Sequence, residues 1–183
     1  MHVEISAVHS RLLYSRCLNS TRRTSVQLSR TRFPAFRNQF YCTAGHEDYP
    51  PNLSKLIQSF SIVPDPMLRY KQLLFLAKKL PSFPEEQRVD DNKVHGCTSQ
   101  VWIVVRVEDG VVYLSADSDS QLTKGLAALL VEGLSGGCVE TILGLPMDFI
   151  QDFGLNQSLT PSRTSGFLNM FQLVKIKIAE LQQ

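Results

Sequence analysis

The stretch VHGCTSQVWIVV, residues 94–105, decides how this chain folds and where its chemistry lies. Gly96 allows the backbone to adopt a positive φ or to approach another group closely. The run that follows Gln100 is rich in β-branched and aromatic residues and predicts a strand. Cys97 therefore lies in a polar loop that is anchored on a rigid element, as reactive residues often are. Because a free cysteine is also commonly a buried apolar group, the local sequence leaves both interpretations of Cys97 open.

A β-hairpin is the strongest short-range prediction. Asp109-Gly110 separates two β-rich runs and favours a two-residue type I′ turn. That turn places Glu108 opposite Val111 and Trp102 opposite Asp117, with one wholly apolar face and one mixed face.

The spacing of apolar residues predicts helices around the hairpin. Asp65 before Pro66 is a helix N-cap followed by proline at the first helical position, and Pro81 ends that helix. Four acidic residues in the polar loop 81–93 are read as a solvated surface. The chain is expected to be an α+β domain of two layers, a small antiparallel sheet built on a hairpin and packed against helices. The expected helical ranges are 53–60, 66–80, 122–130, 139–143, 146–153 and 167–181.

The open end of this hairpin leads to a hypothesis about the thiol. Ser118 and Asp119 are good N-caps for the following helix, and the register places Cys97 at the same end of the sheet. A helix N-terminus beside the sulfur would lower its pKa and favour thiolate.

The charge distribution divides the 183 residues into two parts. Residues 1–46 contain seven Arg and one Glu, are rich in Ser and Thr, and lack a long apolar run, whereas residues 47–183 contain 12 basic and 16 acidic residues. The first part has the composition of an organelle transit peptide, with cleavage expected near Tyr41–Ala44. A disordered basic arm that binds nucleic acid is the alternative. The charge pattern does not distinguish a plastid from a mitochondrion.

Removal of the first part would leave two cysteines, Cys97 and Cys138, without a CxxC motif or a repeated metal-ligand spacing. Neither a disulfide framework nor a structural zinc site is therefore expected. Cys138 is interpreted as a half-buried thiol at a helix start, with a second relay cysteine as the alternative.

Four segments carry a family resemblance: RYKQLLFLAKKLP, VHGCTSQVWIVV, ADSDSQLTKGLAALL and LNQSLTPSRTSGFLNM. In this order they resemble the SufE family of sulfur-acceptor proteins, over about residues 52–182. The resemblance implies a SufE-like domain at 47–183, preceded by a disordered transit peptide at 1–46, and an α+β fold related to that of iron–sulfur scaffold proteins.

The resemblance also implies a function. Cys97 matches the family's sulfur-accepting cysteine, which takes persulfide sulfur from a cysteine desulfurase, activates that enzyme, and delivers the sulfur to an iron–sulfur cluster assembly scaffold. The pyridoxal phosphate of this chemistry belongs to the desulfurase, so the chain itself is expected to bind no cofactor. Neither nucleic acid nor a membrane is an expected partner. The expected compartment is the plastid stroma, with the mitochondrial matrix as the alternative.

Supporting residues are carried over from the matching motifs. Arg163 of the PSRTSG run is expected to pair with a thiolate, a partner carboxylate or the Asp117–Asp119 corner, or to be structural. Capping is expected of Asp119, and close packing of Gly125. The candidate supporting residues around Cys97 are His95, Gly96, Gln100, Asp117, Asp119, Lys124 and Arg163.

Further matching residues lie in the loop and at the start of the strand after it. Gln100 is expected to orient the loop by hydrogen bonding, and Trp102 to pack. His95 is interpreted as a solvated loop residue, with a base toward Cys97 as the alternative.

Three rival functions remain at this point. A cysteine hydrolase needs a positioned histidine base, and the mature chain offers only His46 and His95. An iron–sulfur scaffold needs about three ligands, and Cys97, Cys138 and His95 have no supporting spacing. A regulatory adaptor of a desulfurase that carries no sulfur fits the same motifs.

Overall fold

The computed structural model describes residues 49–155 and 158–183. The chain divides into two units, Met1–Arg37 and Asn38–Gln183, and all described residues belong to the second. The transit segment predicted at 1–46 and its boundary at residue 47 lie outside the described residues and stay predictions. None of the helices in the described part is long and apolar enough to cross a membrane.

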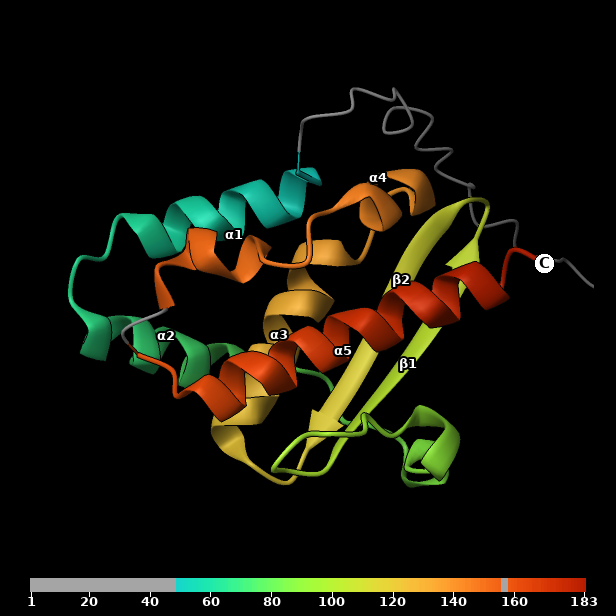
Figure 1. The fold of residues 1–183 in the computed structure, drawn as a ribbon, viewed down its shortest axis with the longest axis horizontal. Coiled ribbons are helices and arrows are strands. Elements are labelled where there is room, and N and C mark those ends of the chain that lie inside the picture. Colours follow the sequence, from blue (N-terminus) through green and yellow to red (C-terminus); the bar gives the residue numbers. More distant parts are fainter. Residues whose placement is uncertain (1–48, 156–157) are drawn as a thin grey trace, which may run out of the picture. The chain divides into compact units, whose positions relative to one another are not determined.

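The described residues form helices, then a hairpin, then helices, which confirms the α+β prediction (Figure 1). The sheet is two-stranded and antiparallel. In chain order the elements are α1 (Pro51–Ser61), α2 (Pro66–Lys79), the 3-10 helices η1 (Glu85–Gln87) and η2 (Asp90–Asn92), β1 (Val101–Glu108), β2 (Val111–Ser118), α3 (Gln121–Leu134), α4 (Val139–Gly144), η3 (Phe149–Phe153) and α5 (Pro161–Glu180).

The hairpin has the predicted register. Glu108 lies opposite Val111 and Trp102 lies opposite Asp117. Both turn residues have a positive φ, 52° at Asp109 and 77° at Gly110, as a type I′ turn requires. The turn therefore determines which side chains of the two strands face the core.

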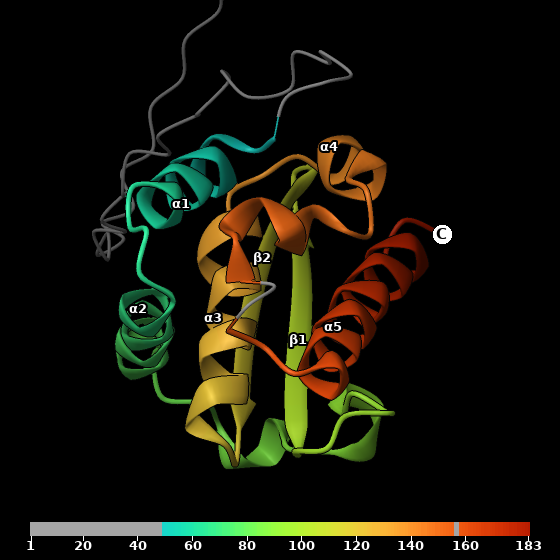
Figure 2. The ribbon, with the colours of Figure 1, turned by 60° about the vertical axis from the view of Figure 1, so that its left-hand side comes forward.

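Helices cover the apolar face of the hairpin. Figure 2 shows α3 and α5 packed beside the strands, with α2 on the other side of α3. The rings of Phe149 and Phe171 lie 4.9 Å apart in an edge-on arrangement, and that of Phe60 lies 5.4 Å from Phe153. Phe residues of α1, η3 and α5 thus close the core above the sheet.

The helix predictions are confirmed for α2, where the Asp65 side chain accepts a hydrogen bond from the Met67 N–H at 2.9 Å. Two ranges differ. The last helix begins at Pro161 rather than near residue 167, and the segment predicted as helix at 146–153 forms the 3-10 helix η3. Ser, Thr and Gly lower the helix propensity of the first α5 turns, but proline at the first position and packing against the Cys97 loop favour helix there.

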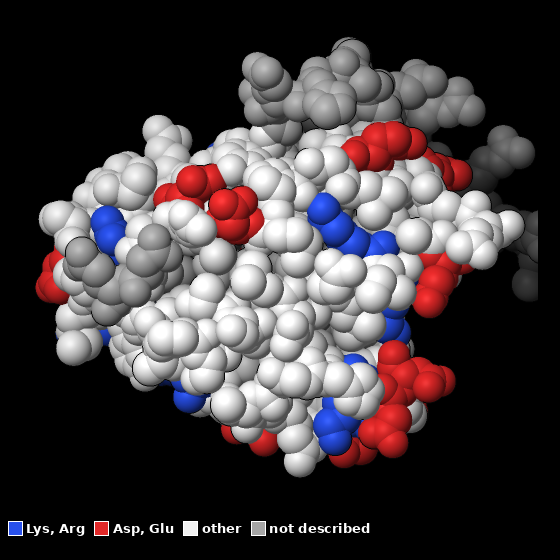
Figure 3. Space-filling model, in the orientation of Figure 1, with Lys and Arg blue, Asp and Glu red and all other residues white. Residues whose placement is uncertain are grey.

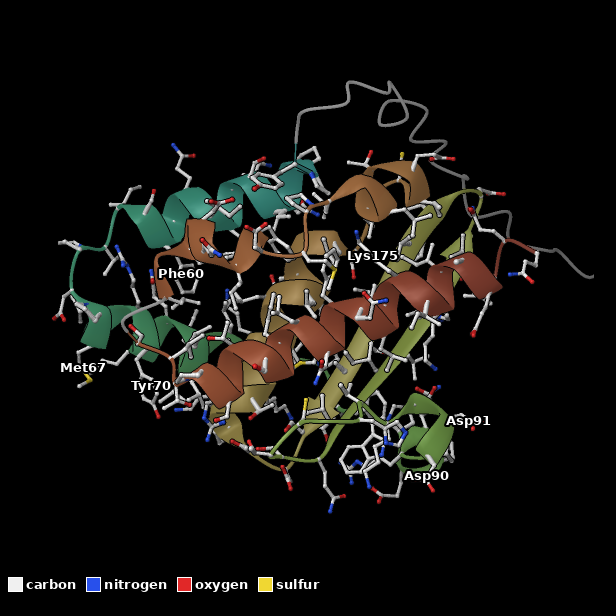
Figure 4. The ribbon with its side chains drawn as sticks, viewed as in Figure 1. Phe60, Met67, Tyr70, Asp90, Asp91 and Lys175 are labelled. Atoms are coloured by element: carbon white, nitrogen blue, oxygen red, sulfur yellow. The ribbon has the colours of Figure 1, made fainter. Side chains whose placement is uncertain are left out.

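The loop between α2 and β1 carries an acidic surface. Figure 3 shows carboxylates gathered at the lower right, where Figure 4 labels Asp90 and Asp91. Glu85 and Glu86 are exposed on the same loop. The predicted solvated surface is confirmed.

Gly125 of α3 lies tightly against the backbone of α2, and we expect it to tolerate no side chain. A Cβ there would lie 2.5 Å from the Leu73 carbonyl oxygen, which belongs to the backbone and cannot move aside cheaply. Gly125→Ala should lower the free energy of unfolding by about 2–3 kcal/mol, measured by urea denaturation. Gly144→Ala is the matched control, since nothing lies within 4 Å of its added Cβ. Equal effects of the two substitutions would contradict the packing argument.

Candidate functional site

The Cys97 loop, residues 94–100, turns back on the start of β1. Val94 is buried, and its N–H donates to the Val101 carbonyl at 2.9 Å. Gly96 has a φ of 75°, which confirms the predicted need for glycine. Cys97 is half-buried and is the free cysteine of the described residues. The loop therefore presents a thiol at the end of the sheet opposite the Asp109-Gly110 turn.

Helix α5 holds this loop from one side. The Cys97 thiol donates to the Gly166 carbonyl oxygen at 3.4 Å, and a Cβ on Gly166 would lie 3.3 Å from the sulfur. One turn along, the Asn169 side-chain amide donates to the Gly96 carbonyl at 3.2 Å. The sequence analysis did not single out Asn169. This residue follows Gly166 by three positions on the same helix and lies within the quoted segment LNQSLTPSRTSGFLNM.

The environment of the sulfur disfavours the thiolate form in this conformation. Burial raises the pKa of the Cys97 thiol above its ordinary value. The Gly166 carbonyl is an acceptor, so it favours the protonated thiol over the anion. Both effects oppose the predicted influence of the α3 N-terminus and favour the neutral thiol.

The other side of the loop is fastened to the end of β2. The Asp119 carboxylate accepts from the Gln100 N–H at 3.0 Å, and the Ser118 hydroxyl donates to the Gln100 carbonyl at 2.8 Å. The predicted capping role of Asp119 is therefore wrong. Ser120 is the N-cap residue of α3, which has no side-chain cap. The carboxylate is instead used to bind the loop. Gln100 takes part in these contacts through its backbone N–H and carbonyl, so the role predicted for this residue stays a prediction.

A chain of hydroxyls joins the loop to Arg163. The Arg163 guanidinium donates to the Thr123 hydroxyl at 2.8 Å, and that hydroxyl donates to the Ser99 hydroxyl at 3.1 Å. Among the described residues Arg163 forms no ion pair with the Asp117–Asp119 corner. Its contact is structural and connects α5, α3 and the Cys97 loop. Thr123 and Ser99 are further residues that sequence reasoning missed.

Asp117 pairs with two other cations. Its carboxylate lies 2.6 Å from the Lys124 ammonium and 2.7 Å from the Arg88 guanidinium, and only 8% of its side chain is exposed. Burial alone would raise the pKa of Asp117, but hydrogen bonds from Lys124, Arg88 and the Ser118 backbone outweigh it, so the pKa is lowered. Arg88 also lies 5.8 Å from the ring centre of Trp102. This network braces β2 and the acidic loop rather than contacting the sulfur.

The remaining candidates lie apart from this arrangement. His95 is exposed, and no hydrogen bond between described residues links it to Cys97. Cys138 is buried at the N-cap of α4 and is disulfide-bonded, which corrects the expectation of a second free thiol. No group of three or more metal-ligating side chains is found among the described residues.

Comparison with known proteins assigns this arrangement to a family. The model of the SufE family, described as an Fe-S metabolism associated domain, matches residues 54–178. The chain belongs to the SufE family. The match includes Cys97, both sides of its loop and the start of α5, so the SufE domain is the folded unit described above.

The SufE relatives come from several kinds of organism. An uncharacterized SufE-like protein of Synechocystis is 48% identical, over 73% of this chain and 84% of that protein. "SufE-like protein 1, chloroplastic/mitochondrial" of Arabidopsis thaliana is 46% identical, over 74% of this chain but only 37% of that protein. "Cysteine desulfuration protein SufE" of Plasmodium falciparum is 36% identical, over 69% of this chain and 53% of that protein. The match thus spans about half or less of the two eukaryotic relatives.

A solved structure supports the fold. The solution structure of a hypothetical protein from Thermus thermophilus aligns with a TM-score of 0.65 and 29% identity. It covers 74% of this chain and the whole of that protein.

We expect alkylation of Cys97 to reveal its protonated state. The rate of modification by iodoacetamide, followed against pH, should give an apparent pKa above that of a free cysteine, about 8.5, because burial disfavours the anion. Peptide mass spectrometry assigns the modified residue, and Cys97→Ser provides the blank. An apparent pKa below that of free cysteine would restore the thiolate hypothesis.

Asn169→Ala should speed this alkylation, because it removes a hydrogen bond that holds the loop on α5. A hydrogen bond is worth about 1 kcal/mol, which corresponds to an increase of about fivefold near neutral pH. Asn52→Ala is the control, since the Asn52 amide donates to the Ser135 carbonyl at 3.1 Å, away from the loop. Equal rates in the two variants would show that Asn169 does not hold the loop.

Proposed function

We propose that this chain is a sulfur carrier that partners a cysteine desulfurase, with Cys97 as the carrying residue. The observation that carries the proposal is the free thiol of Cys97 on a glycine-containing loop, held against α5 by a hydrogen bond to Gly166 and by Asn169. Membership of the SufE family and the name of the Plasmodium falciparum relative, a cysteine desulfuration protein, support the desulfurase as partner.

The transfer step is a thiol–persulfide exchange. The Cys97 thiol loses its proton to solvent, and the thiolate attacks the terminal sulfur of a persulfide on the desulfurase cysteine. A new S–S bond forms on Cys97 while the S–S bond on the desulfurase breaks. The electron pair of the broken bond stays on the desulfurase cysteine, which takes up a proton. No external oxidant or reductant is needed.

The observed conformation protects the Cys97 thiol rather than presenting it for transfer. A neutral thiol is a poor nucleophile, and Cys97 is both half-buried and raised in pKa. Release of the loop from α5 would expose the sulfur and remove the burial that raises its pKa. We infer that docking of the desulfurase releases the loop, and that an iron–sulfur assembly scaffold receives the sulfur. The pyridoxal phosphate that generates the persulfide belongs to the desulfurase.

A direct test uses the full chain, a purified cysteine desulfurase and L-cysteine, with intact-protein mass spectrometry under non-reducing conditions. Wild type should gain the mass of a sulfur atom that dithiothreitol removes. Cys97→Ser should gain none, because a hydroxyl does not attack a persulfide.

Two outcomes would refute the carrier. One is the absence of labile sulfur on wild type, and the other is an equal gain by Cys97→Ser. If Cys97→Ser also stimulates the desulfurase as strongly as wild type does, the chain is a regulatory adaptor that carries no sulfur.

We further propose that this takes place in an organelle, the plastid stroma in the first instance and the mitochondrial matrix as the alternative. The arginine-rich, nearly acid-free composition of residues 1–46 and the name of the Arabidopsis relative support this. A fluorescent protein fused to the full chain should colocalise with chlorophyll in plant cells, and a diffuse cytosolic signal would contradict import.

A further inference from the structure

Helix α2 presents an outward face that combines large apolar side chains with lysines. Three of its apolar side chains are unusually exposed, at 60% for Met67, 46% for Leu68 and 58% for Phe75. Figure 4 shows Met67 pointing away from the ribbon. Positions three or four apart along a helix share one side, which groups these residues with three exposed lysines. The α2 outer face comprises Met67, Leu68, Lys71, Phe75, Lys78 and Lys79.

The charge of this helix differs from that of the rest of the domain. Residues 47–183 contain 12 basic and 16 acidic residues, yet α2 has four basic residues and no acid. One of the four, Arg69, turns inward and donates to the carbonyls of Val63 and Gly154. The three lysines lie on the outer face without an ion pair among the described residues. The α2 outer face is therefore a local positive surface on an acidic domain.

Phe75 lies between these lysines. The Lys79 ammonium is 4.8 Å from the centre of its ring, a cation–π distance. A partner that removes the exposed Phe75 ring from water needs an apolar group against that ring. It also needs carboxylates opposite the surrounding lysines.

We propose that the α2 outer face docks a partner-protein segment in which apolar side chains are interspersed with Asp and Glu. An anionic membrane fits less well, because the opposite side of α2 is buried against α3, with Leu73 and Ala77 in the core. The helix therefore cannot roll to present a full apolar face to a bilayer.

This surface is distinct from the Cys97 loop. In Figure 2, α3 lies between α2 and α5, and it is α5 that holds the loop through Gly166 and Asn169. A segment bound to the α2 outer face would leave the thiol accessible to another protein. The proposal does not depend on sulfur being carried by Cys97.

The test is an NMR titration of the isotope-labelled full chain with a synthetic helical peptide that has Leu at every third or fourth position and Glu between them. Amide shifts should change along α2. Phe75→Ala and Lys78→Glu should each weaken binding by about fivefold or more. A peptide with Lys in place of Glu should not bind α2.

Matched controls lie elsewhere on the surface. Leu181 is 56% exposed on the C-terminal side of α5, and Lys55 is exposed on α1, so Leu181→Ala and Lys55→Glu should leave binding unchanged. The seven arginines of residues 1–46 will also attract an acidic peptide. For this reason the comparison between matched variants, rather than the affinity itself, decides the outcome.

Three results would overturn the proposal. The first is that the α2 variants and their controls weaken peptide binding equally, or that the amide shifts change outside α2 instead of along it. The second is sedimentation with phosphatidylglycerol vesicles that Lys78→Glu abolishes while peptide binding is absent, which would assign the face to a membrane. The third is self-association lost in Phe75→Ala without peptide binding, which would assign it to a second copy of the chain.

Discussion

The site depends on the register of the hairpin. Positive φ values at Asp109 and Gly110 make a two-residue turn, and the turn pairs each residue of β1 with a fixed residue of β2. At the open end this pairing brings Gln100 to Asp119 and the Ser118 hydroxyl, which fasten the last residue of the Cys97 loop. A slip of one residue would turn the core face outward and remove this attachment. The turn thus positions a thiol at the other end of the strands.

Protection of the sulfur and its reactivity impose opposite demands on this loop. Burial beside the Gly166 carbonyl raises the pKa of the Cys97 thiol and keeps it protonated. Nucleophilic attack requires the anion. The observed conformation favours protection over attack, and release of the loop from α5 would remove the burial that disfavours the anion. The thiolate hypothesis considered a nearby helix dipole and left out the desolvation that packing on α5 causes, which acts on the pKa in the opposite direction.

What the sequence predicted correctly is local. The Asp109-Gly110 turn, the Asp65 cap of α2 and the close packing at Gly125 follow from residues near one another or from the absence of a side chain. The contacts that it missed join residues that are distant in the sequence. Asn169 meets Gly96 across 73 positions, and Asp119 binds the Cys97 loop instead of capping α3. A carboxylate at a helix start has two available donors, and only the packed structure decides between them.

The Cys97 loop is held by more hydrogen bonds at its base, beside β1, than at its tip. This difference indicates how the loop can open. The side toward β1 is held by several hydrogen bonds, including those of Gln100 and the hydroxyl chain from Ser99 to Arg163. The tip is held by a weak sulfur–carbonyl contact and one amide of Asn169. Release of the tip therefore costs far less than release of the base. Glycine can adopt more φ and ψ values than other residues, so Gly96 can accommodate the backbone rotation as the tip moves. Ser99 and Gln100 meanwhile keep the loop attached to the sheet.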